Sequence, residues 1–296
     1  MVQKRIQLSL IIPAKCISDQ KLKELLWSIE LQDFKKSEVE VLVITDGTSE
    51  SAKAIGIRKA KGQVIGILAS DNELIEKDFL SEHYKNALYH GSAYPIKYRY
   101  DKKDNILNRY FALIGGNDPL CYYMEKNDRA SYLSDGRFNM NGSIGDNGYF
   151  VRKDLIEKTD LDNYYHIDNA IESGALTAAM PYTIWHKTGG NIFSFFAKRY
   201  RYGLQHAFNK NRRWHLVDFS NPNDIRRFLW FIFATLTILQ PLCLSIRGYL
   251  KVKDVAWFLH PMVCMGTLFT YALLVISLGI KHLLPSQSAP TVVQRA

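Results

Sequence analysis

The chain has 296 residues, enough for one large α/β domain with an appendage. Its 38 basic and 29 acidic residues give a formal net charge of +9, which indicates an anionic partner: nucleic acid, an anionic membrane surface or a phosphorylated substrate. The four cysteines lack the spacing of metal ligands, and we interpret them as free thiols of a reducing compartment, which argues against a zinc site or a disulfide framework.

Apolar runs and helical patterns alternate through the first hundred residues. The first run stops at Pro13, so we interpret it as a strand rather than as a signal peptide. The predicted strands cover residues 8–13, 39–45, 64–69 and 92–98, and the predicted helices cover residues 21–31, 49–60 and 79–88. This alternation predicts βαβ units and a mostly parallel sheet. Neither GxGxxG nor GxxxxGK[ST] occurs, which excludes a dinucleotide fingerprint and a P-loop.

The strand predicted at residues 64–69 ends abruptly in the polar residues Ser70, Asp71 and Asn72. Its apolar run is typical of a strand that is buried on both faces, as in a parallel sheet. Ligands of open α/β sheets bind just beyond the carboxyl ends of the strands, so Asp71 is placed to meet a ligand or a metal. The alternative is that Asp71 and Asn72 cap a following helix, since both residue types are good N-caps.

The middle of the chain, residues 101–146, is rich in turn residues and tyrosines. Long loops beside a sheet are usually functional or disordered, and the tyrosines argue against disorder. The next segment, residues 163–175, contains His166 and Asp168 and is predicted to begin a helix. Residues 194–208 then combine aromatic with basic side chains.

Two apolar runs, residues 228–246 and 256–280, follow near the end of the chain. Each is long enough for the ~20 residues that a membrane helix needs. We favour membrane helices over buried helices of a soluble core because neither run shows a polar face. Pro241 and Pro261 also allow a kinked or re-entrant hairpin. The basic residues beside these runs are better explained by lipid headgroups than by nucleic acid.

Taken together, these segments resemble inverting glycosyltransferase family 2, which has the GT-A fold. The resemblance covers roughly residues 6–205, and it extends to the subset with C-terminal membrane helices that act on lipid-linked substrates. The nucleotide-binding half is similar at Pro13-Ala14, residues 43–48, Ala60-Lys61-Gly62 and residues 68–72. The acceptor half is similar at residues 146–152, 166–168, Trp185-His186 and 198–202.

The resemblance implies a role for each matched residue. The nucleotide-sugar contacts would be Pro13, Ala14, Asp46, Ser70, Asp71 and Asn147. Asp168 would be the catalytic base, and Asp71 with His186 would hold a divalent cation, Mg²⁺ or Mn²⁺. The contacts to phosphate or acceptor would be Lys198, Arg199, Arg201 and Tyr202.

The chain departs from the family pattern at two places. The Asp-X-Asp motif reads Ala69-Ser70-Asp71, and Lys198 and Tyr202 replace the Gln and Trp of the QxxRW segment. Structural alternatives also stay open for several residues. Asp46 could form a turn before Gly47, His186 could be an ordinary hydrogen-bonded histidine, Asp168 could be a surface carboxylate, and Arg199 and Arg201 could contact lipid headgroups.

The sequence therefore predicts a membrane-bound inverting glycosyltransferase on the cytoplasmic face. It would move a sugar from a nucleotide-sugar donor to a hydroxyl of a lipid-linked or membrane-proximal glycan, without a nucleic-acid partner. The alternatives are a polyprenyl-phosphate sugar synthase and a non-catalytic membrane protein that retains a sugar-nucleotide fold. The expected domains are a GT-A domain at 1–210 (nucleotide half 1–100, acceptor half 101–210), a basic linker at 211–227, membrane helices at 228–282 and a tail at 283–296.

Overall fold

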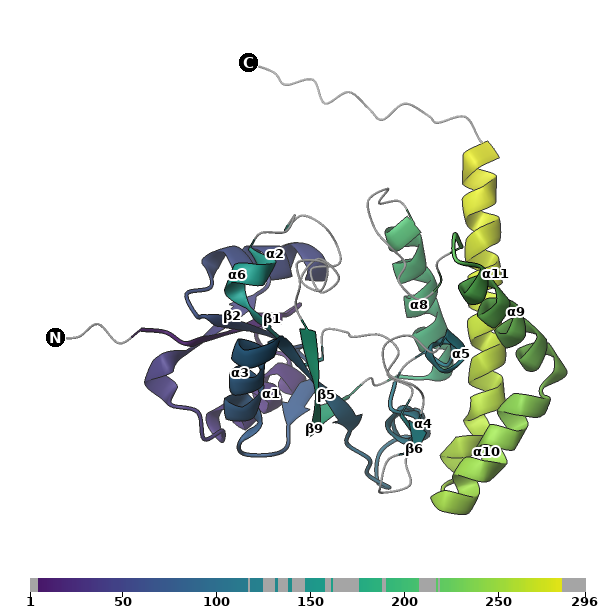
Figure 1. The fold of residues 1–296 in the computed structure, drawn as a ribbon, viewed down its shortest axis with the longest axis horizontal. Coiled ribbons are helices and arrows are strands. Elements are labelled where there is room, and N and C mark those ends of the chain that lie inside the picture. The colour runs from purple at the N-terminus through teal and green to yellow at the C-terminus, as the bar shows by residue number, and fades with distance from the viewer. Residues whose placement is uncertain are drawn as a thin grey trace.

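The computed structural model places an α/β unit beside a layer of helices that includes the C-terminal segment (Figure 1). It describes residues 5–116, 118–124, 131–132, 138–139, 147–157, 161, 176–187, 190–207, 217 and 219–283.

Seven strands form the sheet, in the order β2-β1-β3-β8-β5-β9-β4. Their bounds are Leu8–Pro13 (β1), Val39–Ile44 (β2), Val64–Ile67 (β3), Asn72–Leu74 (β4), Gly91–Tyr98 (β5), Tyr149–Arg152 (β8) and Leu176–His186 (β9). Strand β1 is parallel to β2 and β3, and β5 is parallel to β9. Strand β8 is antiparallel to β3 and β5, and β4 is antiparallel to β9. The expectation of a mostly parallel sheet was therefore wrong, because β8 and β4 make the sheet mixed.

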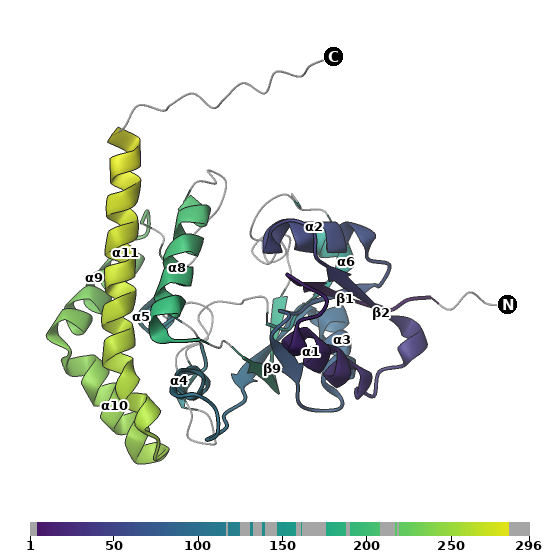
Figure 2. The same ribbon diagram turned by 180° about the vertical axis from the view of Figure 1, so that it is seen from behind.

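Helices cover both faces of this sheet, as Figures 1 and 2 show. On one face lie α1 (Gln20–Glu30) and α3 (Phe79–His90), and on the other lie α2 (Ser49–Lys59) and α6 (Lys153–Ile156). Alternate side chains of β1 supply both layers: Leu10 packs in the cluster of α1 and α3, and Ile11 packs in that of α2 and α6. Each such buried Leu or Ile side chain contributes about 1.5–3 kcal/mol.

The predicted elements of the first hundred residues are confirmed to within two residues at each end. Helix α1 begins after Asp19, whose side chain accepts a hydrogen bond from the backbone N–H of Lys21 at 3.0 Å. The alternative in which Asp71 and Asn72 cap a helix was wrong, since Asn72 begins β4 and the N-cap of α3 is Asp78. The helix predicted at residues 163–175 lies outside the described residues.

A second layer contains helices from the middle and the end of the chain. It comprises α4 (Ile106–Ile114), α5 (Leu120–Met124), α8 (Ile192–Ala207), α9 (Pro222–Thr237), α10 (Leu239–Lys251) and α11 (His260–Leu283). The short 3₁₀ segment η2 (Val255–Leu259) lies between α10 and α11. Two small elements lie elsewhere in the chain: the 3₁₀ segment η1 (Lys36–Glu38), and a two-stranded sheet in which β6 (Ser131–Tyr132) pairs with β7 (Phe138–Asn139). Phe111, Phe195 and Trp257 bring α4, α8 and η2 into one hydrophobic cluster.

The two apolar runs adopt different shapes. Among the described residues, the stretch 255–279 is long and apolar enough to cross a membrane. The first run is broken at Ile238 into α9 and α10, which are bent by 79° relative to each other. Of the two predicted membrane helices, the second thus forms one long helix, whereas the first is divided into two shorter helices at a bend. Ile238 has a φ of 61°, a left-handed conformation that β-branched residues rarely adopt.

Candidate functional site

Three parallel strands end at one edge of the sheet, and polar residues follow these ends. The last residue of β1, Pro13, pairs with Ile44 at the end of β2, and Ile11 pairs with Ile67 at the end of β3. Ala14 continues this edge by donating its N–H to the carbonyl of Ile44 at 3.0 Å. The exposed Asp46 lies in the turn after β2, before α2. The sequence-predicted residues of the nucleotide half are thus brought to one edge, where α/β sheets bind ligands.

Asp71 and His186 face each other beside this edge. The short strand β4 runs antiparallel to the end of β9, with Asn72 opposite His186, and Lys187 donates its N–H to the carbonyl of Asp71 at 3.0 Å. This register brings His186 Nε2 to 3.5 Å from Asp71 Oδ1. The two side chains are 12% and 21% exposed, so both can still meet a ligand.

The carboxyl group of Asp71 is held in its charged form. Burial raises its pKa, but His186, Lys198 and Lys21 favour the carboxylate and lower the pKa below its ordinary value. Lys198 comes from α8 and Lys21 from α1, so cationic side chains from both layers act on one carboxylate. A hydrogen bond of 2.8 Å from Lys21 Nζ to the carbonyl oxygen of Lys187 orients the Lys21 side chain.

Two side-chain amides, those of Asn72 and Asn147, orient the ring of His186. The backbone N–H of Ala69 donates to Asn72 Oδ1 at 2.8 Å, so Asn72 Nδ2 must donate to Asn147 Oδ1, 3.1 Å away. Asn147 then presents its Nδ2 to His186 Nδ1 at 3.4 Å. Because an amide nitrogen only donates, this contact favours the tautomer in which Nδ1 accepts and the Nε2–H is directed at Asp71.

This tautomer bears on the predicted metal ligands. Among the described residues, no group of three or more His, Cys, Asp or Glu side chains could hold a metal ion. Asp71 fits a hard divalent cation, because its carboxylate is ionised and partly exposed and because substrate phosphates can supply further oxygen ligands. His186 is better suited to donate a hydrogen bond than to bind a metal ion. To bind a metal through Nε2, the ring would have to carry its proton on Nδ1, which already faces the donor Nδ2 of Asn147.

We therefore expect His186→Gln to leave metal selectivity unchanged, because the Gln amide can replace the Nε2–H donor. The ratio of the apparent affinities for Mn²⁺ and Mg²⁺, measured by titration in the presence of donor, should stay within about twofold of the wild-type ratio. A nitrogen ligand favours Mn²⁺ over Mg²⁺. A several-fold fall in this ratio, absent from a matched Asp33→Asn control in an exposed loop, would show that His186 is a ligand after all.

The basic residues of α8 divide into two groups. Lys198 acts on Asp71, and Arg201 is exposed. Arg199 instead donates Nη1 to the carboxylate of Asp118 and to the hydroxyl of Tyr271, the latter at 3.3 Å. Its side chain is 18% exposed and that of Asp118 is 8% exposed. Arg199 therefore links α8 to α11 through Asp118 and Tyr271, and its predicted contact with phosphate stays a prediction.

We expect Asp118→Ala to destabilise the protein by about 3–5 kcal/mol, because it leaves the Arg199 guanidinium in a largely buried site without its counter-charge. Chemical unfolding of the detergent-solubilised protein measures this change. The matched control is Arg201→Ala on the exposed side of the same helix, which should cost less than about 0.5 kcal/mol. Equal midpoints for the two variants would contradict the role assigned to the pair.

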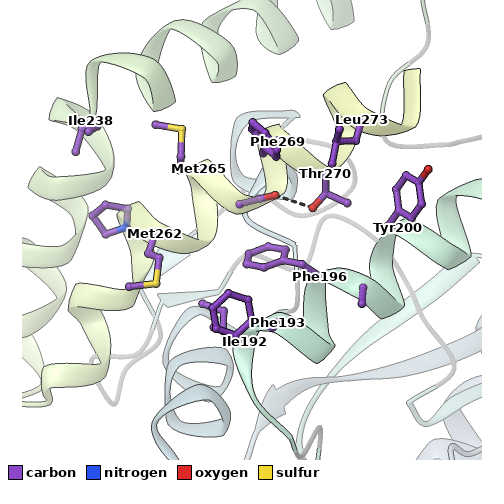
Figure 3. Close-up of a pocket in the computed structure, with 13 residues that line it drawn as sticks. Ile192, Phe193, Phe196, Tyr200, Ile238, Met262, Met265, Phe269, Thr270 and Leu273 are labelled. Atoms are coloured by element: carbon purple, nitrogen blue, oxygen red, sulfur yellow. Dashed lines mark hydrogen bonds between the residues drawn. The ribbon is translucent and has the colours of Figure 1, made fainter. Parts of the chain in front are cut away.

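An apolar groove of about 730 Å³ lies between α8 and α11 (Figure 3). Phe193 and Phe196 line it from α8, and Met262 and Phe269 line it from α11. Lys198 follows Ala197, which also lines the groove, so α8 connects the groove to the carboxylate site. Sequence reasoning did not predict the groove, because its two walls are more than sixty residues apart.

Some of the predicted site residues are not placed. Asp168 lies outside the described residues, as does the side chain of Tyr202. Ser70 follows β3 at the same edge as Asp71. Two residues that sequence reasoning missed belong to the site: Lys21, which acts on Asp71, and Asn72, which orients Asn147. The sequence did contain a signal for Lys21: it lies in the first turn of the helix that follows β1, which places it near the edge where β1 ends.

Comparisons with known proteins leave the family open. No family model matches the chain, and no curated protein matches it. Among solved structures, the chain is similar to residues 1–349 of TarS from S. aureus, with 14% identity over 93% of this chain and 92% of that one and a TM-score of 0.45. It is also similar to the mannosyltransferase PcManGT from Pyrobaculum calidifontis, solved with GDP-Man and Mn²⁺, with 11% identity over 92% and 88% and a TM-score of 0.49. Likeness at this level assigns neither fold family nor function.

Proposed function

We propose that this protein is a membrane-associated inverting glycosyltransferase of the GT-A type. It transfers a sugar from a nucleotide-sugar donor to a hydroxyl of a lipid-linked or membrane-proximal glycan. The observation that carries the proposal is the carboxylate of Asp71 beside the edge where β1, β2 and β3 end, with its pKa lowered by His186, Lys198 and Lys21. This arrangement suits a nucleoside diphosphate, which presents a base and ribose at one end and a charged diphosphate at the other.

Each end of the donor has candidate partners. Asp46, exposed after β2, can accept hydrogen bonds from the ribose or the base, and Pro13 and Ala14 form the adjacent floor. Asp71 would hold a divalent cation, Mg²⁺ or Mn²⁺, which when bound neutralises the diphosphate as a Lewis acid. Lys198, whose charge lowers the pKa of Asp71, would contact the same diphosphate. The negative charge that builds on the departing nucleotide is thus met by fixed cationic groups.

The acceptor side rests on two features. A sugar hydroxyl needs a general base, and the family resemblance offers Asp168 for this role. The apolar groove between α8 and α11 gives a lipid-linked acceptor room for its hydrocarbon part beside Lys198. An acceptor held on the side of the sugar opposite to the diphosphate would invert the anomeric configuration.

A polyprenyl-phosphate sugar synthase is the second candidate. The groove favours it equally, because a polyprenyl phosphate also combines an apolar chain with an anionic head, and Lys198 could bind that head. Asp168 would then be dispensable, since a phosphate monoester with a second pKa of about 6 is already a nucleophile at neutral pH. A non-catalytic role is the third candidate, because Ala69 replaces the first carboxylate of the Asp-X-Asp motif. In each case we place the α/β unit on the cytoplasmic face.

The proposal is tested by the products of the purified protein in mixed micelles with donor and acceptor. The new glycosidic bond should have the anomeric configuration opposite to that of the donor, as measured by proton coupling constants. Retention of configuration would exclude the inverting mechanism. A product on bare polyprenyl phosphate, formed at the same rate by Asp168→Asn, would favour the synthase.

A further inference from the structure

Helix α11 buries several polar side chains and exposes many large apolar ones, which is unusual for a helix on a water-soluble protein. The side that packs against the rest of the chain buries polar side chains, namely His260, Thr267, Thr270 and Tyr271, among the apolar Val263 and Leu274. The rest of its surface exposes large apolar side chains, namely Met262, Phe269, Leu273, Val275 and Ile276, of which the first three also line the groove beside α8. An apolar outer face of this size marks a surface that is covered by something other than water.

Helix α11 is held to α4 and α8 by hydrogen bonds along much of its length. Tyr110 of α4 hydrogen bonds to His260 at 2.8 Å, and Tyr200 of α8 hydrogen bonds to Ser277 at 2.7 Å. Positions 260 and 277 are about 25 Å apart along a helix. Between them, Tyr271 donates to Asp118, the partner of Arg199. If α11 crossed a bilayer, this ion pair would lie near the middle of the hydrocarbon, where charged groups are costly.

Helices α9 and α10 form a V whose apex points away from the sheet, as both views show (Figures 1 and 2). At 16 and 13 residues, the arms measure about 24 and 20 Å, shorter than the roughly 30 Å of bilayer hydrocarbon. The 79° bend shortens their combined reach further. The apex exposes Leu236, Ile238 and Leu239, all apolar.

The charges of this surface lie at the two ends of the V. Exposed Arg226 lies in the first turns of α9, and exposed Arg247, Lys251 and Lys253 lie at the end of α10 and just after it. The acidic residues of the same segment, Asp224 and Asp254, are buried. The exposed formal charge of the described residues 222–279 is therefore entirely basic, which complements anionic lipid headgroups.

We infer that α9, α10 and α11 embed this protein in one leaflet of an anionic membrane and that no helix crosses the bilayer. The apex of the V enters the hydrocarbon, the basic ends of its arms lie among the headgroups, and α11 lies along the membrane surface. Figure 1 agrees with this arrangement, because α11 runs across the line that joins the sheet to the apex of the V. This inference concerns lipid contact alone and does not depend on the proposed sugar transfer.

Cysteine labelling with a membrane-impermeant maleimide tests the topology. The background carries Cys243→Ser and keeps the exposed Cys16 as a reporter for the side of the α/β unit. The test sites are Lys251→Cys, after the V, and Gly279→Cys, where an added Cβ meets nothing within 4 Å. One-leaflet embedding predicts that all three sites react in inverted membrane vesicles and none in intact spheroplasts. Labelling of residue 251 from the side opposite to Cys16 would show a crossing and overturn the inference.

Vesicle flotation tests whether lipid is the partner. The wild-type protein should float with vesicles that contain about one-third anionic lipid, and Trp230→Glu, in the exposed face of α9, should reduce the bound fraction about tenfold or more. The matched control is Trp27→Glu on α1, because Trp27 and Trp230 are 66% and 51% exposed. Equal flotation of the two variants, or no binding of the wild-type protein, would overturn the inference whatever the enzymatic activity.

Discussion

Asp71→Asn is expected to lower the rate of sugar transfer by about 10²–10³-fold or more, with the fold intact. The amide keeps the shape of the side chain but removes the charge on which the proposed cation depends. Folding should be unaffected, because the contact that holds this segment to β9 is made by the backbone carbonyl of Asp71, which accepts from Lys187. Initial rates at saturating donor, beside circular dichroism of both proteins, measure the two effects.

The matched control is Asp33→Asn, an exposed carboxylate in the loop after α1, which should keep the wild-type rate. Excess chelator should abolish activity in the wild-type protein, and Mn²⁺ or Mg²⁺ should restore it. An active Asp71→Ala variant, or full turnover in chelator, would remove the metal role from Asp71.

Asp168→Asn is expected to lower kcat by about 10²–10⁴-fold with a hydroxyl acceptor. A sugar hydroxyl is a poor nucleophile until a base accepts its proton, and Asn cannot accept it. Donor binding should hardly change, because the lost interaction is used chiefly in the transition state. Comparison of kcat with the Kd for the donor, measured by calorimetry, separates these two quantities.

Two results would contradict this role. Weaker donor binding in Asp168→Asn would indicate that Asp168 holds the metal or a loop. Efficient transfer by the same variant to bare polyprenyl phosphate would identify the phosphate as the nucleophile and favour the synthase. His166→Asn, two residues away, is the control for local disturbance of this segment.

The strands and helices of the nucleotide half could be predicted because each is specified by a pattern of neighbouring residues. The β-branched run of β3 and the helical spacing of α1 each lie within a dozen residues. The edge at which β1, β2 and β3 end followed from these elements, and so did the position of Asp71. What could not be predicted was the pairing of β8 with β3 and β5, because a four-residue antiparallel strand contributed from some eighty residues downstream has no local signal.

The site partners of Asp71 show the same limit. His186 was predicted to be near it from the family resemblance alone, whereas Lys21 and the Asn72–Asn147 chain depend on register. A kink was allowed at Pro241, but the break lies three residues earlier, at Ile238, where the apolar pattern continues without a signal. The buried polar side chains of α11 were missed because they are scattered in an apolar run.

The central claim is that this chain transfers sugar from a nucleotide donor, and a panel of nucleotide sugars tests it directly. Membranes containing the wild-type protein, with matched membranes containing Asp71→Asn, are incubated with each donor in turn, and free nucleoside diphosphate and labelled glycolipid are both measured. We expect one preferred donor that yields the two products in equal amounts, only with the wild-type protein and only with divalent cation. Binding of a donor without release of nucleotide by any member of the panel would contradict it and leave the non-catalytic alternative.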